Sequence, residues 1–226
     1  MTWSIDKYGS KESRDYIAMI KVSDPKMACK VIDNSIQVAV YDDAGGSHAS
    51  RLWWILRWLG HEAVAVIDGG WSCWIKEERP VSSELLIPEA KKFIASPRLS
   101  WTVTADEILK DLNNPATRVL DARSAQRFRG ENEKFDPVAG HIPGAHSAPF
   151  TDNLDENGNW KSRSELRQKF ENLLDGSPAE EAVSYCGSGI TACHNILAMY
   201  HAGLGDSRLY PGSWSEWITK NDRPVE

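Results

Sequence analysis

Short apolar runs alternate with longer amphipathic stretches along this chain. In the second half the pattern predicts strand, helix, strand, helix, strand and helix over residues 118–121, 166–174, 182–185, 192–202, 209–210 and 214–218. In the first half it predicts strand, helix and strand over residues 37–41, 51–59 and 64–67. Strands that alternate with helices are typical of an α/β fold with a mainly parallel sheet.

The two halves also resemble each other. Residues 69–81 and 212–225 share a Trp-x-x-Trp-Ile segment followed by Arg-Pro-Val, and the tryptophans lie 143 positions apart. Gly60 and Gly203 have the same separation, and Tyr41-Asp42 lies opposite Tyr185-Cys186. Repeated features at nearly one offset indicate two copies of one domain.

The repeat predicts the domain organisation. We expect a shortened first copy over residues 1–83, a linker over residues 84–100 and a full second copy over residues 101–226. The first copy has no visible counterpart of residues 119–123, so we expect its sheet to lack the corresponding strand. The sequence leaves open whether this short form is native or a truncation.

Composition narrows the classes of function. The net charge is −6, which predicts no strong attraction to nucleic acid or to anionic membranes. We recognise no signal peptide and no apolar stretch of transmembrane length, so we expect a cytoplasmic protein. Four scattered cysteines without a Cys-x-x-Cys pair predict neither a disulfide scaffold nor a metal site.

Cys186 is the strongest candidate for chemistry. It follows a predicted strand, and Gly187 and Gly189 lie between it and the next helix. Glycines permit a tight loop whose N–H groups converge on one point, and the helix N-terminus adds partial positive charge there. Such surroundings favour a nucleophilic thiolate. Most cysteines are small buried residues instead, and we expect Cys193, two helical turns further on, to be one of these.

The segment Cys-Gly-Ser-Gly-Ile-Thr-Ala-Cys, residues 186–193, resembles the active-site loop of two-domain rhodaneses, which are thiosulfate and 3-mercaptopyruvate sulfurtransferases. Gly-His-Ile-Pro-Gly-Ala at residues 140–145 resembles the other hallmark of that family, in which we expect His141 to fix a turn. Residues 120–130 are similar to its substrate-binding stretch, and residues 41–54 to its inactive first domain.

The resemblance implies fold and mechanism together. It implies two rhodanese-like α/β domains, the first of them inactive. Catalytic Cys186 would take sulfur from a small anionic donor and hold it as a persulfide. A thiol, cyanide or a thioredoxin-like protein would accept that sulfur, and neither a metal nor an organic cofactor would be needed. The residues implied to bind the substrate are Arg127, Gly187, Ser188, Gly189, Ile190 and Thr191.

The donor stays open between thiosulfate and 3-mercaptopyruvate. Ser188 resembles the mercaptopyruvate enzymes, whereas thiosulfate enzymes often carry Arg and Lys after the cysteine. Those mercaptopyruvate enzymes have a second arginine where this chain has Lys134, which keeps the charge and loses the forked geometry.

Two other functions compete with sulfur transfer. A phosphatase of the same fold needs a longer loop that ends in an arginine, and residues 186–191 contain none. The shortened first copy favours a non-catalytic binding or regulatory module, which is the main alternative.

Overall fold

The chain divides into two compact units, Met1–Arg98 and Leu99–Glu226. The computed structural model describes residues 32–82, 90–112, 114 and 117–226, together with the backbone of residues 17–21. Within these residues, no helix combines the length and apolar character needed to cross a membrane.

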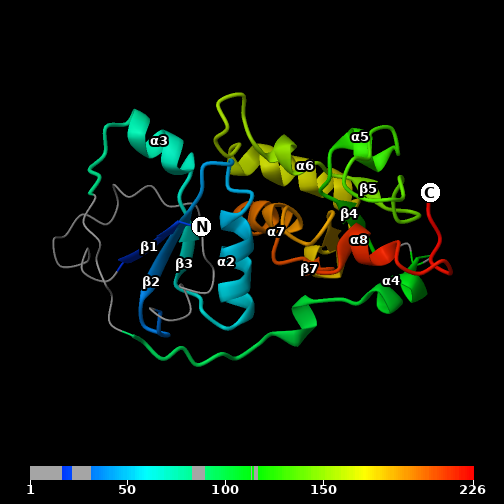
Figure 1. Cartoon of the computed structure of the whole chain (residues 1–226), viewed down its shortest axis with the longest axis horizontal. Helices are drawn as coiled ribbons and strands as arrows, with labels where there is room; N and C mark the ends of the chain where they lie inside the picture. Colours follow the sequence, from blue (N-terminus) through cyan, green and yellow to red (C-terminus); the bar gives the residue numbers. More distant parts are fainter. Residues whose placement is uncertain (1–16, 22–31, 83–89, 113, 115–116) are drawn as a thin grey trace. The chain divides into compact units, whose positions relative to one another are not determined.

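The second unit is built on a parallel sheet of four strands in the order β5-β4-β6-β7 (Figure 1). In that order the strands are His146–Ser147, Val119–Asp121, Val183–Tyr185 and Arg208–Leu209. Its α-helices α4 to α8 are Ala105–Asp111, Ala125–Phe128, Arg163–Leu174, Ala192–His201 and Ser213–Trp217. Short 3-10 helices lie at Leu99–Trp101, Phe150–Asn153 and Ala179–Glu181.

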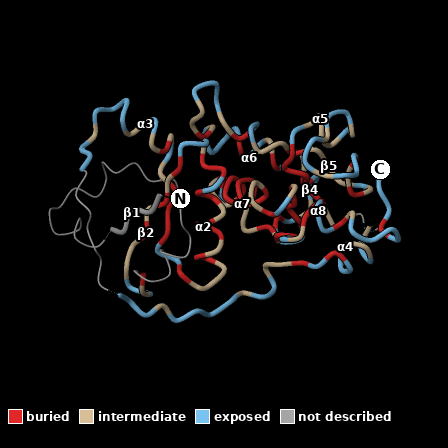
Figure 2. The backbone as a smooth tube through the Cα atoms, in the orientation of Figure 1, coloured by how far each residue is buried: buried red, intermediate tan, exposed pale blue. Residues whose placement is uncertain are grey.

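Burial follows the apolar pattern of the sequence. Every residue of β4 and β6 is buried, as expected for central strands of a covered parallel sheet (Figure 2). Helix α7 buries eight of its ten residues. The core beside these elements includes Tyr185, Trp214 and Trp217, each less than 2% exposed. The carboxyl ends of β4 and β6 therefore sit on a rigid base.

The first unit contains a three-stranded parallel sheet in the order β1-β2-β3. The strands are Ile17–Lys21, Gln37–Tyr41 and Val64–Val66. Helix α2 covers Ala49–Trp58, and α3 covers Gly70–Lys76. The helix that the sequence predicts at 51–59 and the strand that it predicts at 64–67 are confirmed within two residues at each end.

The prediction that the sheet of the first copy lacks a strand is wrong. Strand β1 pairs with β2 over five residues, on the side of β2 opposite β3. In the second unit β4 pairs with β6 in the same arrangement. The sequence contains the necessary apolar run, Ile-Ala-Met-Ile. This run does not share the offset of about 143 residues that relates the other repeated features.

The same contact closes the last helix of each unit. The indole N–H of Trp74 donates to the carbonyl of Pro80 at 3.0 Å. The indole N–H of Trp217 donates to the carbonyl of Pro224 at 2.8 Å. The Trp and Arg-Pro-Val positions shared by the two halves thus build the same local turn in both.

Part of the segment expected to be a linker adheres to the first unit. The side-chain amide of Asn34 donates to the carbonyl of Ile94 at 3.1 Å and accepts from its N–H at 3.0 Å. The N–H of Ser96 donates to the carbonyl of Leu59 at 2.9 Å. Residues 83–89 lie outside the described residues, so the boundaries 83/84 and 100/101 stay predictions.

Candidate active site

Cys186 lies directly after β6, and residues 187–191 lead from it into α7. The side chain is buried, and the residue is 2% exposed. Two hydrogen bonds tie the start of the loop to α8. The N–H of Trp214 donates to the carbonyl of Cys186 at 2.9 Å, and the N–H of Ser215 donates to that of Gly187 at 3.0 Å.

Ser213, the first residue of α8, also holds the backbone of Cys186. Its hydroxyl accepts from the N–H of Cys186 at 3.1 Å and donates to the carbonyl of Tyr210 at 2.9 Å. Ser213 has φ of 55°, a left-handed conformation that costs a residue other than glycine about 1 kcal/mol. Nothing in the sequence marks this residue, because its conformation depends on the chain around it.

The loop requires glycine at position 189. Gly189 has φ of 75°, and a β-carbon there would lie 2.6 Å from the carbonyl oxygen of Pro211. Cys193 packs behind the loop, with its thiol donating to the carbonyl of Gly189 at 3.4 Å. Cys193 is fully buried, in agreement with the structural role expected from the sequence.

The loop ends at the N-terminus of α7. Thr191 precedes the helix, and its side chain makes no capping hydrogen bond in the part of the chain that the structure describes. The first-turn N–H groups of a helix carry partial positive charge. The N-terminus of α7, a helix of ten residues, is therefore suited to stabilise an anion at this end of the loop.

Arg127 reaches the loop from α5. A β-carbon placed on Gly187 would lie 3.6 Å from Nη1 of Arg127 and 3.7 Å from Nη2. The guanidinium is held by two carboxylates, with Nε 3.1 Å and 2.9 Å from the two oxygens of Glu133 and Nη2 3.0 Å from Asp136. The structure thus brings Arg127 to the loop and supplies two partners that the sequence comparison did not identify.

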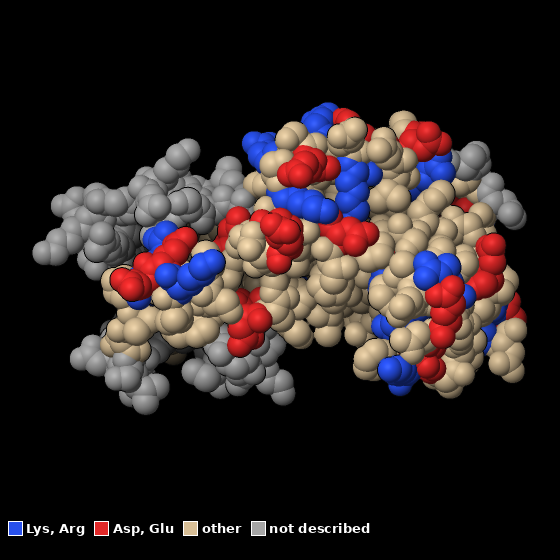
Figure 3. Space-filling view, turned by 90° about the horizontal axis from the view of Figure 1, so that it is seen from above, with Lys and Arg blue, Asp and Glu red and all other residues tan. Residues whose placement is uncertain are grey.

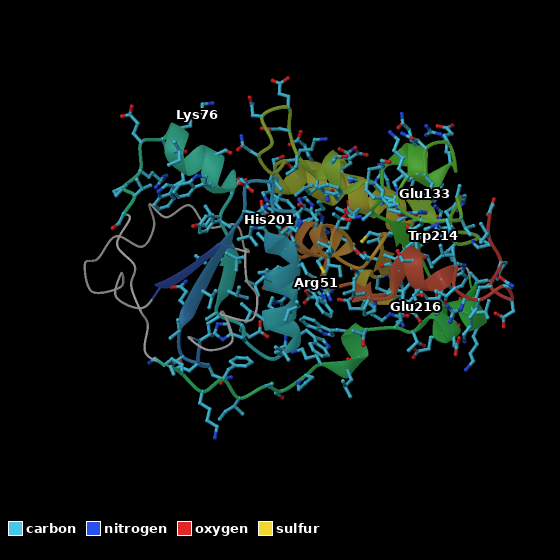
Figure 4. All side chains as sticks on the ribbon, in the orientation of Figure 1. Arg51, Lys76, Glu133, His201, Trp214 and Glu216 are labelled. Atoms are coloured by element: carbon cyan, nitrogen blue, oxygen red, sulfur yellow. The ribbon has the colours of Figure 1, made fainter. Side chains whose placement is uncertain are left out.

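A second arginine of the same stretch has a structural role. Arg123 makes a buried ion pair with Asp121, at 2.6 Å between Nη2 and Oδ2, and donates to the carbonyl of Gly140 at 2.7 Å. Its guanidinium lies 4.7 Å from the ring centre of Trp214. Figure 4 labels Trp214 on α8 and Glu133 near α5, and Arg123 contacts both of these residues. The Asp-Ala-Arg motif therefore supports the base of the site.

The remaining residues singled out in the sequence differ in exposure and in contacts. Ser188 is exposed, whereas Ile190 and Thr191 are half-buried in the same loop. Lys134 is exposed on the segment that carries Glu133 and Asp136. His141 fixes a turn as expected. Its ring nitrogen Nδ1 lies 2.8 Å from the carbonyl oxygen of Phe128, and its backbone N–H donates to the carbonyl of Glu226.

The first unit has a corresponding loop, with Asp42 at the position of the cysteine. One carboxylate oxygen of Asp42 accepts from the N–H groups of Ala44 and Gly46 at 2.9 Å and 2.8 Å. The other accepts from those of His48 and Ala49 at 2.9 Å and 2.8 Å. Burial alone would raise the pKa of Asp42, but these four bonds outweigh it and lower the pKa.

Charge is not segregated on the face of the molecule in Figure 3, where basic and acidic side chains are interspersed. The described part of this face therefore carries no extended patch of a single sign.

Comparisons with known proteins agree with this geometry. A family described as "Rhodanese-like domain" matches residues 6–77 and 104–220. The chain is 46% identical to a probable 3-mercaptopyruvate sulfurtransferase of Pseudomonas aeruginosa, over 84% of this chain and 67% of that protein. It is 39% identical to the thiosulfate sulfurtransferase of Mus musculus, over 84% of this chain and 65% of that protein.

Solved structures give the same result. The 3-mercaptopyruvate sulfurtransferase from Leishmania major superposes with a TM-score of 0.72 at 32% identity, over 87% of this chain and 55% of that one. The chain spans about two thirds of the length of the curated relatives that it matches.

Proposed function

Because the chain belongs to the rhodanese-like family, we propose that it is a sulfurtransferase that carries sulfur as a persulfide on Cys186. The observation that supports this most is the loop of Asp42. There, in the same chain, a loop between a strand and a helix directs four N–H groups at one buried anion. Cys186 occupies the same point of the corresponding loop, where a terminal persulfide anion would need such donors.

The reaction is a double displacement. The thiolate of Cys186 attacks the outer sulfur of thiosulfate, a Cys–S–S⁻ group forms, and sulfite leaves with the electron pair of the broken S–S bond. With 3-mercaptopyruvate the C–S bond breaks instead, and the thiol proton ends on C3 of the pyruvate that leaves. An acceptor such as cyanide then takes the outer sulfur and restores the thiolate.

The roles of the other residues follow from their positions. Arg127 binds the anionic part of the donor through the guanidinium edge that faces Gly187. The N–H groups of Gly187, Ser188, Gly189, Ile190 and Thr191 surround the transferred sulfur. The absence of a side chain at Gly187 leaves room for the donor beside Arg127.

The acceptor and the compartment belong to the same proposal. No disulfide joins the three cysteines within the described residues. A nucleophilic thiol persists in a reducing compartment, so the proposal places the protein in the cytosol with a thiol, cyanide or a thioredoxin-like protein as acceptor.

A turnover assay tests the proposal. Thiocyanate formation from each donor and cyanide is measured for the wild-type protein, for Cys186→Ser and for the matched variant Cys193→Ser. The proposal expects activity in the wild-type protein and in Cys193→Ser, and its loss in Cys186→Ser. Retention of more than a few per cent of turnover by Cys186→Ser, or absence of turnover in the wild-type protein with both donors, contradicts it.

A further inference from the structure

Arg127 lies in a cluster that holds more negative than positive charge. The cluster contains Arg123 and Arg127, and the carboxylates paired with them are Asp121, Glu133 and Asp136. Asp121 neutralises Arg123 in a pair whose side chains are at most 1% exposed. Two carboxylates therefore remain for the single positive charge of Arg127.

Glu133 is the carboxylate that fixes the position of Arg127. Its two oxygens accept from Nε of Arg127, and Oε1 also accepts from the N–H groups of Phe135 and Asp136 at 2.9 Å and 3.3 Å. Burial alone would raise the pKa of Glu133, but these hydrogen bonds outweigh it and lower the pKa. Glu133 thus stays charged and anchors the inner side of the guanidinium.

Asp136 contacts the outer side, where a donor would bind. It accepts from Nη2 of Arg127, and Nη1 and Nη2 are the two atoms nearest to a β-carbon placed on Gly187. A carboxylate or sulfonate is bound in a fork by this edge of an arginine. Asp136 therefore shares Nη2, one of the two nitrogens that a bidentate donor would use.

We infer that Asp136 sets the donor preference of the site by offsetting the charge of Arg127. This inference rests on the proposed function. Repulsion from a fixed negative charge grows with the charge of the ligand, so it opposes thiosulfate, a dianion, more than 3-mercaptopyruvate, whose carboxylate carries one charge. Asp136 thereby favours the monoanionic donor, even though Lys134 does not supply the second arginine of the mercaptopyruvate enzymes.

The local geometry permits a clean test of charge. The second oxygen of Asp136 accepts from the hydroxyl of Ser215 at 2.7 Å. An asparagine accepts from Arg127 through its oxygen and donates to the same hydroxyl through its amide, so Asp136→Asn removes the charge and keeps both contacts. The matched control is Glu131→Gln, which removes an equal charge from the exposed pair Arg129–Glu131 on the same segment.

The first measurement is kcat/KM for each donor at constant ionic strength. Asp136→Asn is expected to raise the value for thiosulfate roughly tenfold and that for 3-mercaptopyruvate roughly threefold, with smaller gains at high salt. Glu131→Gln is expected to change neither by more than about twofold. An equal gain for both donors, or a loss for both, would overturn the inference.

A second measurement is independent of sulfur transfer. Cys186 is alkylated with iodoacetate, an anion, and with iodoacetamide, its neutral analogue. Asp136→Asn is expected to raise the ratio of the two rates about threefold or more, whereas Glu131→Gln leaves it unchanged. An unchanged ratio in Asp136→Asn overturns the inference. A raised ratio without turnover of either donor supports it and contradicts the proposed function instead.

Discussion

Two loops of this chain join a strand to a helix and differ in the group at the end of the strand. After β2 the group is Asp42, a carboxylate that four backbone N–H groups surround. After β6 it is Cys186, which we propose gains and loses an anionic sulfur. The backbone carbonyl of each residue accepts a hydrogen bond at 2.9 Å from a backbone N–H in the helix that follows the next strand. The donor is Trp71 for Asp42 and Trp214 for Cys186. One loop therefore stabilises its unit, and the other is available for chemistry.

The position that precedes those tryptophans shows a second difference. Gly70 and Ser213 both have φ of 55°. A β-carbon on Gly70 would lie 2.2 Å from the carbonyl oxygen of Asp42, whereas the β-carbon of Ser213 is accommodated and its hydroxyl binds the N–H of Cys186. The turn before Trp214 accepts a strained residue, and the loop of Cys186 thereby gains a hydrogen bond that fixes its cysteine.

Exchange of the cysteine for the residue of the first loop gives the largest expected effect. Cys186→Asp is expected to lower sulfur transfer by more than about a thousandfold, because a carboxylate forms no persulfide. The folded state is expected to remain at least as stable as the wild type, since the carboxylate can accept the loop N–H groups. Assays of turnover and urea unfolding check both parts. A loss of more than about 2 kcal/mol would show that the second loop does not hold an anion.

Removal of the carboxylate from the first loop affects stability. Asp42→Ala is expected to destabilise the first unit by about 3 kcal/mol at pH 7, because four backbone N–H groups, two of them buried, lose their acceptor. The pKa of Asp42 is lowered in the folded state. Its contribution is therefore complete above the pKa of the unfolded chain, about 3.9, and is lost as the pH falls through the lower folded value.

Hydrogen exchange of residues 37–66 in Asp42→Ala, at pH 7 and at pH 3, measures this effect. The neighbouring exposed residue provides the control variant Asp43→Ala. A difference from the wild type that is equal at both pH values would contradict the role of the ionised carboxylate.

Arg127→Ala separates donor binding from the chemistry of the thiol. It is expected to lower kcat/KM for an anionic donor roughly 10–100-fold, about 1.4–2.7 kcal/mol. Alkylation of Cys186 by neutral iodoacetamide is expected to proceed at nearly the wild-type rate. Equal loss of both reactions would mean that Arg127 supports the fold and does not bind the donor.

The smallest effect concerns the strained residue after Gly212. Ser213→Gly is expected to change stability by less than about 1 kcal/mol, because relief of the left-handed strain offsets the lost hydrogen bond. The matched change Gly70→Ala introduces a clash and is expected to cost more than about 2 kcal/mol. Denaturant unfolding of both variants checks the difference. Equal effects would show that the two turns are not built differently.

The sequence predicted those parts of the molecule that depend on local patterns. The central strands and the helix after Cys186 follow from apolar spacing, and the loop follows from its two glycines. Strand β1 was missed because a four-residue apolar run outside the repeat gives no distinctive signal. Its assignment as a strand depends on pairing with β2, which is a property of the folded chain.

The sequence predicted which segments form the site, but it did not predict the carboxylates that balance the charge of Arg127. Arg127 and the loop came from a family resemblance, but that comparison did not identify the carboxylates that neutralise Arg127. Glu133 and Asp136 stand six and nine residues after Arg127, and a carboxylate so close in sequence to an arginine was the available signal. Only the structure shows that both turn toward the same guanidinium.

Mass spectrometry can detect sulfur on Cys186 itself. The protein is incubated with thiosulfate or 3-mercaptopyruvate without an acceptor, digested without reductant and analysed by mass spectrometry. We expect a gain of one sulfur, about 32 Da, on the peptide that contains Cys186, reversed by dithiothreitol and absent in Cys186→Asp. Sulfur found on Cys193 or Cys73 instead, or turnover without any gain at Cys186, would contradict it.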